Sequence, residues 1–122
     1  EASKYSFIHM DGSLRGLLKE ECSTGLDVLE ALTPSPVGDV EFKDLADFAS
    51  GNKTILWGGL PGSYFTSMVS EQEFERHIKE VLNIMTKEPR YVLGVADQVP
   101  PDALESRIKR VSELVEMYGK FE

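Results

Sequence analysis

The sequence has little cysteine and little positive charge. Cys22 is its single cysteine, which excludes an intrachain disulfide framework and a multi-cysteine zinc module and is typical of a reducing compartment. Lys and Arg total 13 against 21 Asp and Glu, so the net charge of the 122 residues is -8 at pH 7. Because nucleic acid and anionic lipid are also negative, this charge disfavours both as partners.

Long apolar runs are absent as well. No segment approaches the roughly 18–20 apolar residues of a bilayer-spanning helix, so we expect no membrane association. The first residues, Glu1 to Lys4, lack the charged-then-apolar layout of a signal peptide. We therefore expect a cytoplasmic protein with one domain over residues 1–122. The chain does not begin with Met, which suggests a processed chain or a piece of a longer parent.

Four short apolar runs alternate with stretches of helical periodicity. The runs predicted to be buried parallel strands are Tyr5–Met10, Leu26–Ala31, Thr54–Trp57 and Tyr91–Val95. This alternation predicts an α/β fold, because parallel neighbours need a crossover long enough to hold a helix. Four such βα units fit either a small open doubly wound sheet or half of an eight-stranded barrel of about 250 residues.

Helix boundaries are marked by capping residues. Ser70 followed by Glu73 is a capping box, and Asp39 and Asp102 stand just before two other helical stretches. Leu14 and Leu18 begin the apolar face of the first helix, which Cys22 continues four residues later. We expect Pro89 to end the third helix.

Polar residues close the predicted strands, where parallel α/β proteins place their ligand sites. His9 and Asp11 share one face of the first strand if it extends that far. With Glu30, which closes the second strand, and Asp97 at the close of the fourth, they form a candidate site for zinc or a similar metal. The structural alternative is that His9 and Asp11 bond to each other and that Asp11 begins a turn.

A glycine-rich segment follows the third predicted strand. Gly58, Gly59, Leu60 and Pro61 are predicted to form a loop whose backbone N–H groups bind an anionic substrate. The alternative is a tight turn that needs glycine for positive φ. The segment is not a phosphate-binding P-loop, because the Lys-Ser/Thr ending is absent.

Five other residues have simpler interpretations. Cys22 is expected in the core, because free cysteine behaves as a small hydrophobic residue. His77 lies in a highly charged helix and is expected to be solvated. Tyr64, Phe65 and Met68 either line an apolar pocket or belong to the core.

Taken in order, these strand ends resemble a known family. The motifs are His9-x-Asp11-Gly12, Gly25-Leu26-Asp27-Val28-Leu29, Gly58-Gly59-Leu60-Pro61, and Leu93-Gly94-Val95-Ala96-Asp97 with Pro100-Pro101-Asp102-Ala103. They resemble the C-terminal half of the uroporphyrinogen decarboxylase superfamily, which includes cobamide-dependent methyltransferases. The resemblance runs from about Phe7 to Val115 and implies a TIM-type (β/α)8 barrel to which this chain contributes the last four units.

The resemblance implies two possible activities of the parent. In the methyltransferases a His-x-Cys motif and a second Cys hold zinc; His9 matches that His, Asp11 replaces the first Cys, and Ala96 or Asp97 stands near the second. Glu30 lies where related methionine synthases place an acidic ligand. A corrinoid-linked, metal-assisted methyltransferase is therefore the first expectation, with His9, Asp11, Glu30 and Asp97 at the metal and a corrinoid protein as partner.

The alternatives are tetrapyrrole decarboxylation and a non-catalytic binding module. The decarboxylases also lack cysteine ligands, and their Gly-Asn-Leu-Asp-Pro loop corresponds to Gly58-Gly59-Leu60-Pro61 without the Asn or Asp. Their arginine and aspartate substrate clamps lie mostly in the N-terminal half of the barrel, so we expect this chain to be inactive alone. A half barrel exposes two sheet edges, so its partner is expected to be the N-terminal half or a second copy in a homodimer.

Overall fold

The computed structural model describes residues 3–51, 53–88 and 90–121. Strands and helices alternate along the chain, with one short 3-10 helix after the third strand. The strands are β1 (Phe7–His9), β2 (Val28–Leu32), β3 (Ile55–Pro61) and β4 (Tyr91–Ala96), and the helices are α1 (Leu18–Ser23), α2 (Phe42–Gly51), η1 (Gly62–Phe65), α3 (Glu71–Met85) and α4 (Glu105–Tyr118).

The four strands form one sheet in the order β1-β2-β3-β4, and all neighbours are parallel. This confirms the predicted α/β fold with a parallel sheet. His9 pairs with Glu30, and the register between β2 and β3 shifts after Leu29. Ala31, at this irregularity, has a φ of 64°, which only a minority of non-glycine residues adopt.

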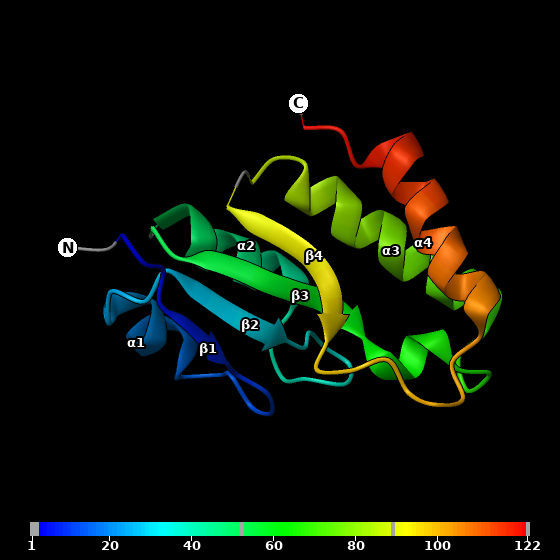
Figure 1. Ribbon diagram of the computed structural model, residues 1–122, viewed down its shortest axis with the longest axis horizontal. Coiled ribbons are helices and arrows are strands. Elements are labelled where there is room, and N and C mark those ends of the chain that lie inside the picture. Colours follow the sequence, from blue (N-terminus) through cyan, green and yellow to red (C-terminus); the bar gives the residue numbers. More distant parts are fainter. Residues whose placement is uncertain (1–2, 52, 89, 122) are drawn as a thin grey trace.

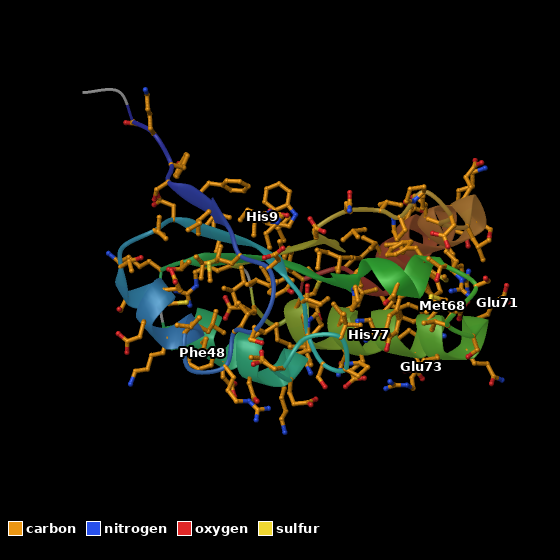
Figure 2. All side chains as sticks on the ribbon, turned by 90° about the horizontal axis from the view of Figure 1, so that it is seen from below. His9, Phe48, Met68, Glu71, Glu73 and His77 are labelled. Atoms are coloured by element: carbon orange, nitrogen blue, oxygen red, sulfur yellow. The ribbon has the colours of Figure 1, made fainter. Side chains whose placement is uncertain are left out.

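Helices α1, α2 and α3 cover one face of the sheet and leave part of the other open, while α4 packs against α3 (Figures 1 and 2). Leu29, Leu56 and Tyr91 are buried on the helical side. Because side chains alternate along a strand, Phe7, His9 and Trp57 project from the opposite side and remain partly exposed. Figure 2 shows His9 on the side of the sheet away from α1, α2 and α3.

The open face is concave. The rings of Phe7 in β1 and Trp57 in β3 meet across β2, with 6.1 Å between their centroids. His9 at the end of β1 also lies 3.5 Å from the carboxylate of Asp97, which follows β4. Only a curled sheet can bring side chains of its first and last strands this close, since neighbouring strands are about 4.8 Å apart.

The predicted strands are in the right places, but the bounds of all four differ from the prediction, and those of β1 and β3 differ most. β1 spans Phe7–His9 rather than Tyr5–Met10, so it does not extend far enough to place Asp11 on the same strand face as His9. β3 continues through Pro61 instead of ending at Trp57, because β4 pairs with it along its whole second half, from Gly58 to Pro61.

Two helix starts are also corrected. Leu14 is buried but precedes α1, which begins only at Leu18. Asp39 caps no helix; its carboxylate accepts the backbone N–H groups of Leu14 and Arg15 instead. The Ser70 cap is confirmed, since its hydroxyl accepts the N–H of Glu73 over 3.2 Å.

The fourth helix begins at Glu105, with Leu104 rather than Asp102 at its N-cap. α3 ends at Met85, and Pro89 lies outside the described residues. Within the described ranges, no helix has the length and apolar character needed to cross a membrane.

Candidate functional site

His9 is held between two carboxylates at the carboxyl end of the sheet. Its Nδ1–H donates to Glu30 Oε2 over 2.7 Å, and its Nε2 lies 3.5 Å from Asp97 Oδ1. His9 ends β1, Glu30 lies beside it in the middle of β2, and Asp97 follows β4, so the sheet brings together three of the four side chains that the sequence pointed to. His9 and Asp97 are about half exposed, whereas the side chain of Glu30 is mostly covered.

This arrangement shifts the protonation of His9. The hydrogen bond to Glu30 raises the pKa of the imidazole above its ordinary value, and the charges of Glu30, Asp97 and Asp11 add to the effect. Since Glu30 accepts a hydrogen bond from Nδ1–H, Nε2 is the ring nitrogen that can exchange a proton with water or a substrate. The group is suited to exchange protons near neutral pH.

Asp97 itself has an unusual backbone. Its φ is 65°, a left-handed conformation that costs free energy in a residue with a side chain. This conformation turns the chain sharply after β4 and directs the Asp97 carboxylate back towards His9.

Asp11 is less closely involved. It contributes to the electrostatic field at His9, but the bonds of the imidazole go to Glu30 and Asp97. The alternative in which His9 and Asp11 bond to each other therefore differs from the observed contacts. The physical reason is that β1 ends at His9, so Asp11 no longer follows the alternation of the strand.

Two of these residues have the spacing of zinc ligands. Two zinc ligands at about 2.0–2.1 Å from a tetrahedral ion lie about 3.3–3.4 Å apart, which is close to the 3.5 Å between His9 Nε2 and Asp97 Oδ1. Glu30 would then orient the imidazole from the far side, as carboxylates behind metal-bound histidines do. In the described ranges, however, no group of three or more His, Cys, Asp and Glu side chains is arranged to hold a metal ion.

The segment from Gly58 to Pro61 is part of β3, so the prediction of a loop here is wrong. Its residues pair with β4 from Leu93 to Ala96, and Leu60 and Pro61 are buried. Glycine is required for contact rather than for a turn: a Cβ on Gly58 would lie 2.5 Å from the Leu32 carbonyl oxygen, and φ there is 146°.

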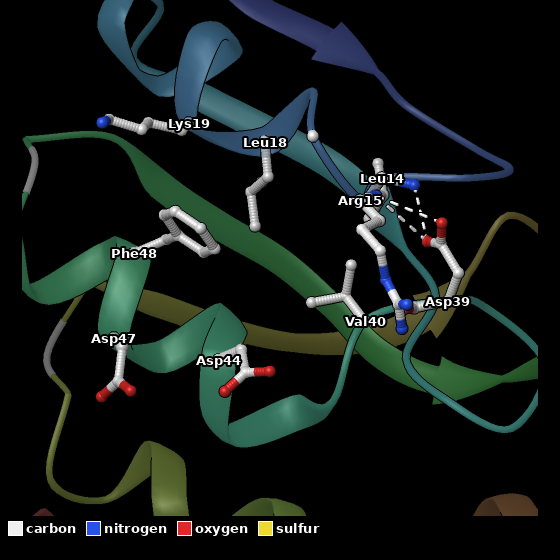
Figure 3. A pocket seen from close by; sticks show the side chains of 10 residues that line it. Leu14, Arg15, Leu18, Lys19, Asp39, Val40, Asp44, Asp47 and Phe48 are labelled. Atoms are coloured by element: carbon white, nitrogen blue, oxygen red, sulfur yellow. Dashed lines mark hydrogen bonds between the residues drawn. The ribbon is translucent and has the colours of Figure 1, made fainter.

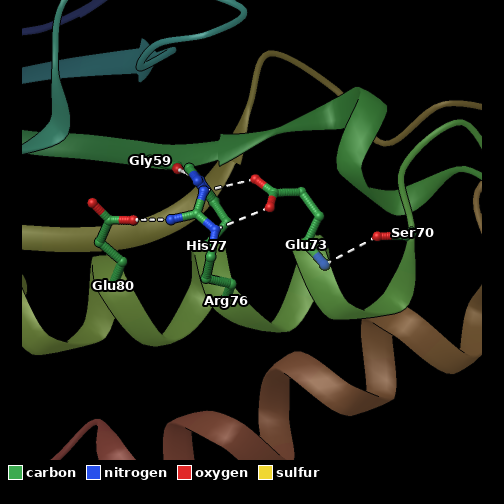
Figure 4. Close-up of polar contacts among 6 residues, drawn as sticks. All are labelled: Gly59, Ser70, Glu73, Arg76, His77 and Glu80. Carbon is green, nitrogen blue, oxygen red and sulfur yellow. Dashed lines mark hydrogen bonds and ion pairs between the residues drawn. The ribbon is translucent and has the colours of Figure 1, made fainter.

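His77 is buried, with 5% of its surface exposed, so its predicted solvation is wrong. Its Nε2–H donates to the carbonyl of Gly59 over 2.9 Å (Figure 4), and its ring packs on Tyr64. Burial lowers the pKa of this imidazole. The helical periodicity of α3 is the sequence signal for this burial, since His77 lies on the same apolar face as Phe74 and Ile78.

The neighbouring Arg76 explains why the helix looks so polar in sequence. It bonds to Glu73 and Glu80 on the solvent side of α3 (Figure 4). These residues fill one face of the helix while His77 turns inward. These charged side chains still lie near the imidazole, since Glu73, Arg76 and Glu80 line one pocket with His77 and act on its pKa.

Other predicted positions fall into the core. Cys22 is buried as expected, and burial raises the pKa of its thiol. Tyr64 and Phe65 belong to the core rather than to an open pocket, whereas Met68 is 84% exposed.

A cavity of about 490 Å³ lies on the helical side, between the loop before α1 and helix α2 (Figure 3). Its apolar wall includes Leu18, Val40 and Phe48. At its rim the Arg15 side chain donates to the backbone carbonyl of Asp39, and the Asp39 carboxylate accepts N–H groups from the same loop. These hydrogen bonds fix the loop that follows β1.

Arg107 was not singled out by the sequence, although it is 5% exposed. Its guanidinium donates to the backbone carbonyls of Tyr64, Thr66 and Val69 and lies over the ring of Phe74. It therefore joins α4 to the segment that follows β3. An arginine within a charged amphipathic helix carries no sequence signal for burial.

The concave face holds the second set of residues that the sequence left out. Phe7 and His9 project on the same side of β1, and Trp57 faces them from β3. The alternation of Phe7 with His9 along β1 is the sequence signal for this shared face. Comparisons of this chain with family models, curated proteins and solved structures found no match.

Proposed function

We propose that this chain forms the C-terminal half of a (β/α)8 barrel enzyme of the uroporphyrinogen decarboxylase superfamily, in which His9 transfers a proton during decarboxylation of a tetrapyrrole. The observation that supports it is the imidazole of His9 held between Glu30 and Asp97 at the carboxyl end of a parallel sheet. Ligand sites of barrel enzymes lie at this end. In this proposal the protein is cytoplasmic.

The chemistry requires a proton donor at a carbon atom. Decarboxylation breaks the bond between a carbon and its carboxylate, CO₂ leaves, and the electron pair that remains on the carbon takes up a proton. The hydrogen bond and the negative charges that raise the pKa of His9 increase the share of its ring that is protonated near neutral pH. Nε2 then donates, Glu30 holds the ring through Nδ1, and solvent restores the proton because His9 is half exposed.

The concave sheet supports the half-barrel part of the proposal. Parallel sheets are nearly always covered on both faces, yet here the helices cover one face and Phe7 and Trp57 are exposed on the other. The sheet ends at β1 and β4, which pair with no further strand among the described residues. An N-terminal half barrel or a second copy of this chain fits these edges.

The test compares the decarboxylation rates of wild-type and variant barrels. Each barrel is assembled either from two copies of this chain or from this chain and its N-terminal half. With uroporphyrinogen III as substrate and anaerobic handling, we expect His9→Gln to lower the rate at least about 100-fold, the usual contribution of general acid–base catalysis. Lys109→Gln, on the exposed side of α4, is the control and keeps the rate. Full activity of His9→Gln, or no product from any assembly, contradicts the proposal.

A second candidate is metal-assisted methyl transfer with a corrinoid protein as partner. The distance between His9 Nε2 and Asp97 Oδ1 favours it, since it suits two ligands of one zinc ion. The described part of the chain lacks a complete ligand set, so the remaining ligands would come from the other half of the barrel or from a thiol substrate.

Elemental analysis distinguishes the two candidates. Protein purified without chelator is compared with His9→Ala. About one zinc per chain that is lost on substitution supports methyl transfer, while folded protein without zinc supports proton transfer. A non-catalytic binding module remains the third proposal, and it predicts neither zinc nor turnover.

A further inference from the structure

A second cavity, of about 350 Å³, lies on the helical side of the sheet between the start of α2 and helix α3. Phe42 and Val81 form its apolar wall, and His77 lines it as well. Figure 2 shows His77 on the side of the sheet opposite to His9. A partner that covers the open face therefore leaves this cavity accessible.

The buried imidazole of His77 carries an unpaired acceptor at this cavity. Its Nε2–H donates to the carbonyl of Gly59, and burial lowers the pKa of the ring, so the ring is neutral. In a neutral imidazole with its proton on Nε2, Nδ1 is an acceptor. Nδ1 has no hydrogen-bond partner among the described residues, and a ligand with an N–H donor would supply one.

The hydroxyl of Tyr91 is a second unpaired polar atom beside the cavity. Tyr91 is 4% exposed, and in the described part of the chain its hydroxyl has no hydrogen-bond partner. A Cβ on Gly59 would lie 2.7 Å from this oxygen, 3.0 Å from the Phe42 ring and 3.5 Å from Val81. The hydroxyl thus lies beside the two residues of the apolar wall, where buried polar groups are normally paired.

The charged side chains at the cavity are three glutamates and one arginine, which leaves two negative charges in excess. Arg76 lies between Glu73 and Glu80 (Figure 4) and bonds to Glu80 through Oε2 alone. The carboxylate of Glu41 bonds to no residue that the structure describes. Glu80 in α3 and Glu41 before α2 therefore provide unused acceptors on two different walls.

We propose that this cavity binds a linear aliphatic diamine. One ammonium group donates to His77 Nδ1 and Glu80, the other donates to Glu41, and the carbon chain lies against Phe42 and Val81. Each ammonium group has three N–H donors and no acceptor, and its two charges match the excess of carboxylates. A metal ion fits less well, because within the described ranges no three His, Cys, Asp or Glu side chains are arranged to hold one.

The test follows the ring protons of the two histidines by NMR while putrescine is added to the chain. The ionic strength is kept low, so that charge interactions are little screened. We expect a saturable shift of the His77 signals with a Kd of about 1 mM or below. His9 is the internal control, because carboxylates also surround it, and its signals should move much less.

Two glutamate variants test the two ends of the site. Glu41→Gln and Glu80→Gln should each weaken putrescine binding about fivefold, because each removes one charged acceptor. Glu116→Gln removes the same charge from the exposed surface of α4 and should change the Kd less than about twofold. Circular dichroism checks that each variant is folded, and Glu41→Gln is the decisive one because its side chain bonds to no described residue.

Two related compounds test the chemistry of the ligand. Butylamine keeps the chain and one ammonium group, so we expect it to bind about tenfold more weakly than putrescine. The diol of the same length has no charge and should leave the His77 signals in place.

Three results overturn the inference: no shift of His77 at about 10 mM putrescine, unchanged binding by Glu41→Gln, and butylamine or the diol binding as tightly as putrescine. None of these residues takes part in proton transfer by His9. Diamine binding and decarboxylation can therefore fail independently of each other.

Discussion

At the scale of single residues, the chain places its two histidines in opposite environments. His9 lies on the open face and bonds to a carboxylate, while His77 is buried on the other side and bonds to a carbonyl. The carboxylate stabilises the imidazolium of His9, whereas burial disfavours the imidazolium of His77.

Because the sequence contains two histidines, their ring protons can be resolved by NMR during a pH titration. We expect His9 to titrate above the ordinary value of about 6.5 and His77 below it. Glu30→Gln removes the largest cause of the shift of His9 and should bring its pKa down while leaving that of His77 in place. If both rings titrate together in the wild type, the bond between His9 and Glu30 is absent in solution.

The same two residues should give the stability of the fold opposite dependences on pH. Below about 6.5 the unfolded chain protonates His77 but the folded chain resists, so the free energy of unfolding falls as pH drops. His9 contributes stability that is complete below that pH and is lost as pH rises through its raised pKa.

Urea unfolding measures how the free energy of unfolding depends on pH in wild type, His9→Gln and His77→Gln. Measurements at about pH 5.5, 6.5 and 7.5 bracket the ordinary histidine pKa of about 6.5. His77→Gln should remove the fall at low pH, and His9→Gln the decline at high pH. Equal slopes in the three proteins would contradict the assignment.

At the scale of elements, glycines in β3 decide how closely strands approach. Gly58 and Gly12 both have positive φ, but a Cβ on Gly58 would meet the backbone of Leu32, while a Cβ on Gly12 has nothing within 4 Å. We expect Gly12→Ala to lower the free energy of unfolding by about 1 kcal/mol and Gly58→Ala by about 3 kcal/mol or more. Urea unfolding measures both, and similar losses would show that strain in φ alone is responsible.

The join between α4 and the segment after β3 depends on Arg107. Replacing it with Met leaves the carbonyls of Tyr64, Thr66 and Val69 without a donor. We expect a loss of about 3 kcal/mol in the free energy of unfolding, because hydrogen bonds to a charged group are strong and buried acceptors are left unpaired. Lys109→Met, on the exposed side of the same helix, should change it by less than about 0.5 kcal/mol.

The sequence predicted the elements better than their ends. Alternation of apolar runs and helical faces located all four strands and the main helices, because these patterns come from burial on one face. The extension of β3 to Pro61 could not be read locally, since it depends on pairing with β4. In the site, His9 and Asp97 followed from their places at strand ends and Glu30 from its place in the neighbouring strand. Trp57 and Arg107, in contrast, make their contacts with segments that are distant in the sequence.

At the scale of the whole molecule, the open concave face and two free sheet edges favour association. We expect the chain to form dimers at about 10 μM, with β1 of one copy beside β4 of the other, because exposed apolar faces and strand edges pair readily. Phe7→Glu places a charge on the open face of the edge strand and should shift the equilibrium towards monomer. Sedimentation velocity measures this, and a monomer at all concentrations would favour a closed, flavodoxin-like packing instead.

Arg107 also affects which contacts of the molecule are lost first when acid or salt is added. The ion pairs of Arg76 and Arg110 lie on the surface and depend on glutamates, so acid neutralises them and salt screens them. The partners of Arg107 are backbone carbonyls, which have no charge to lose. Acidified protein should therefore release the outer surface of α3 first and keep α4 attached to the carboxyl end of the sheet.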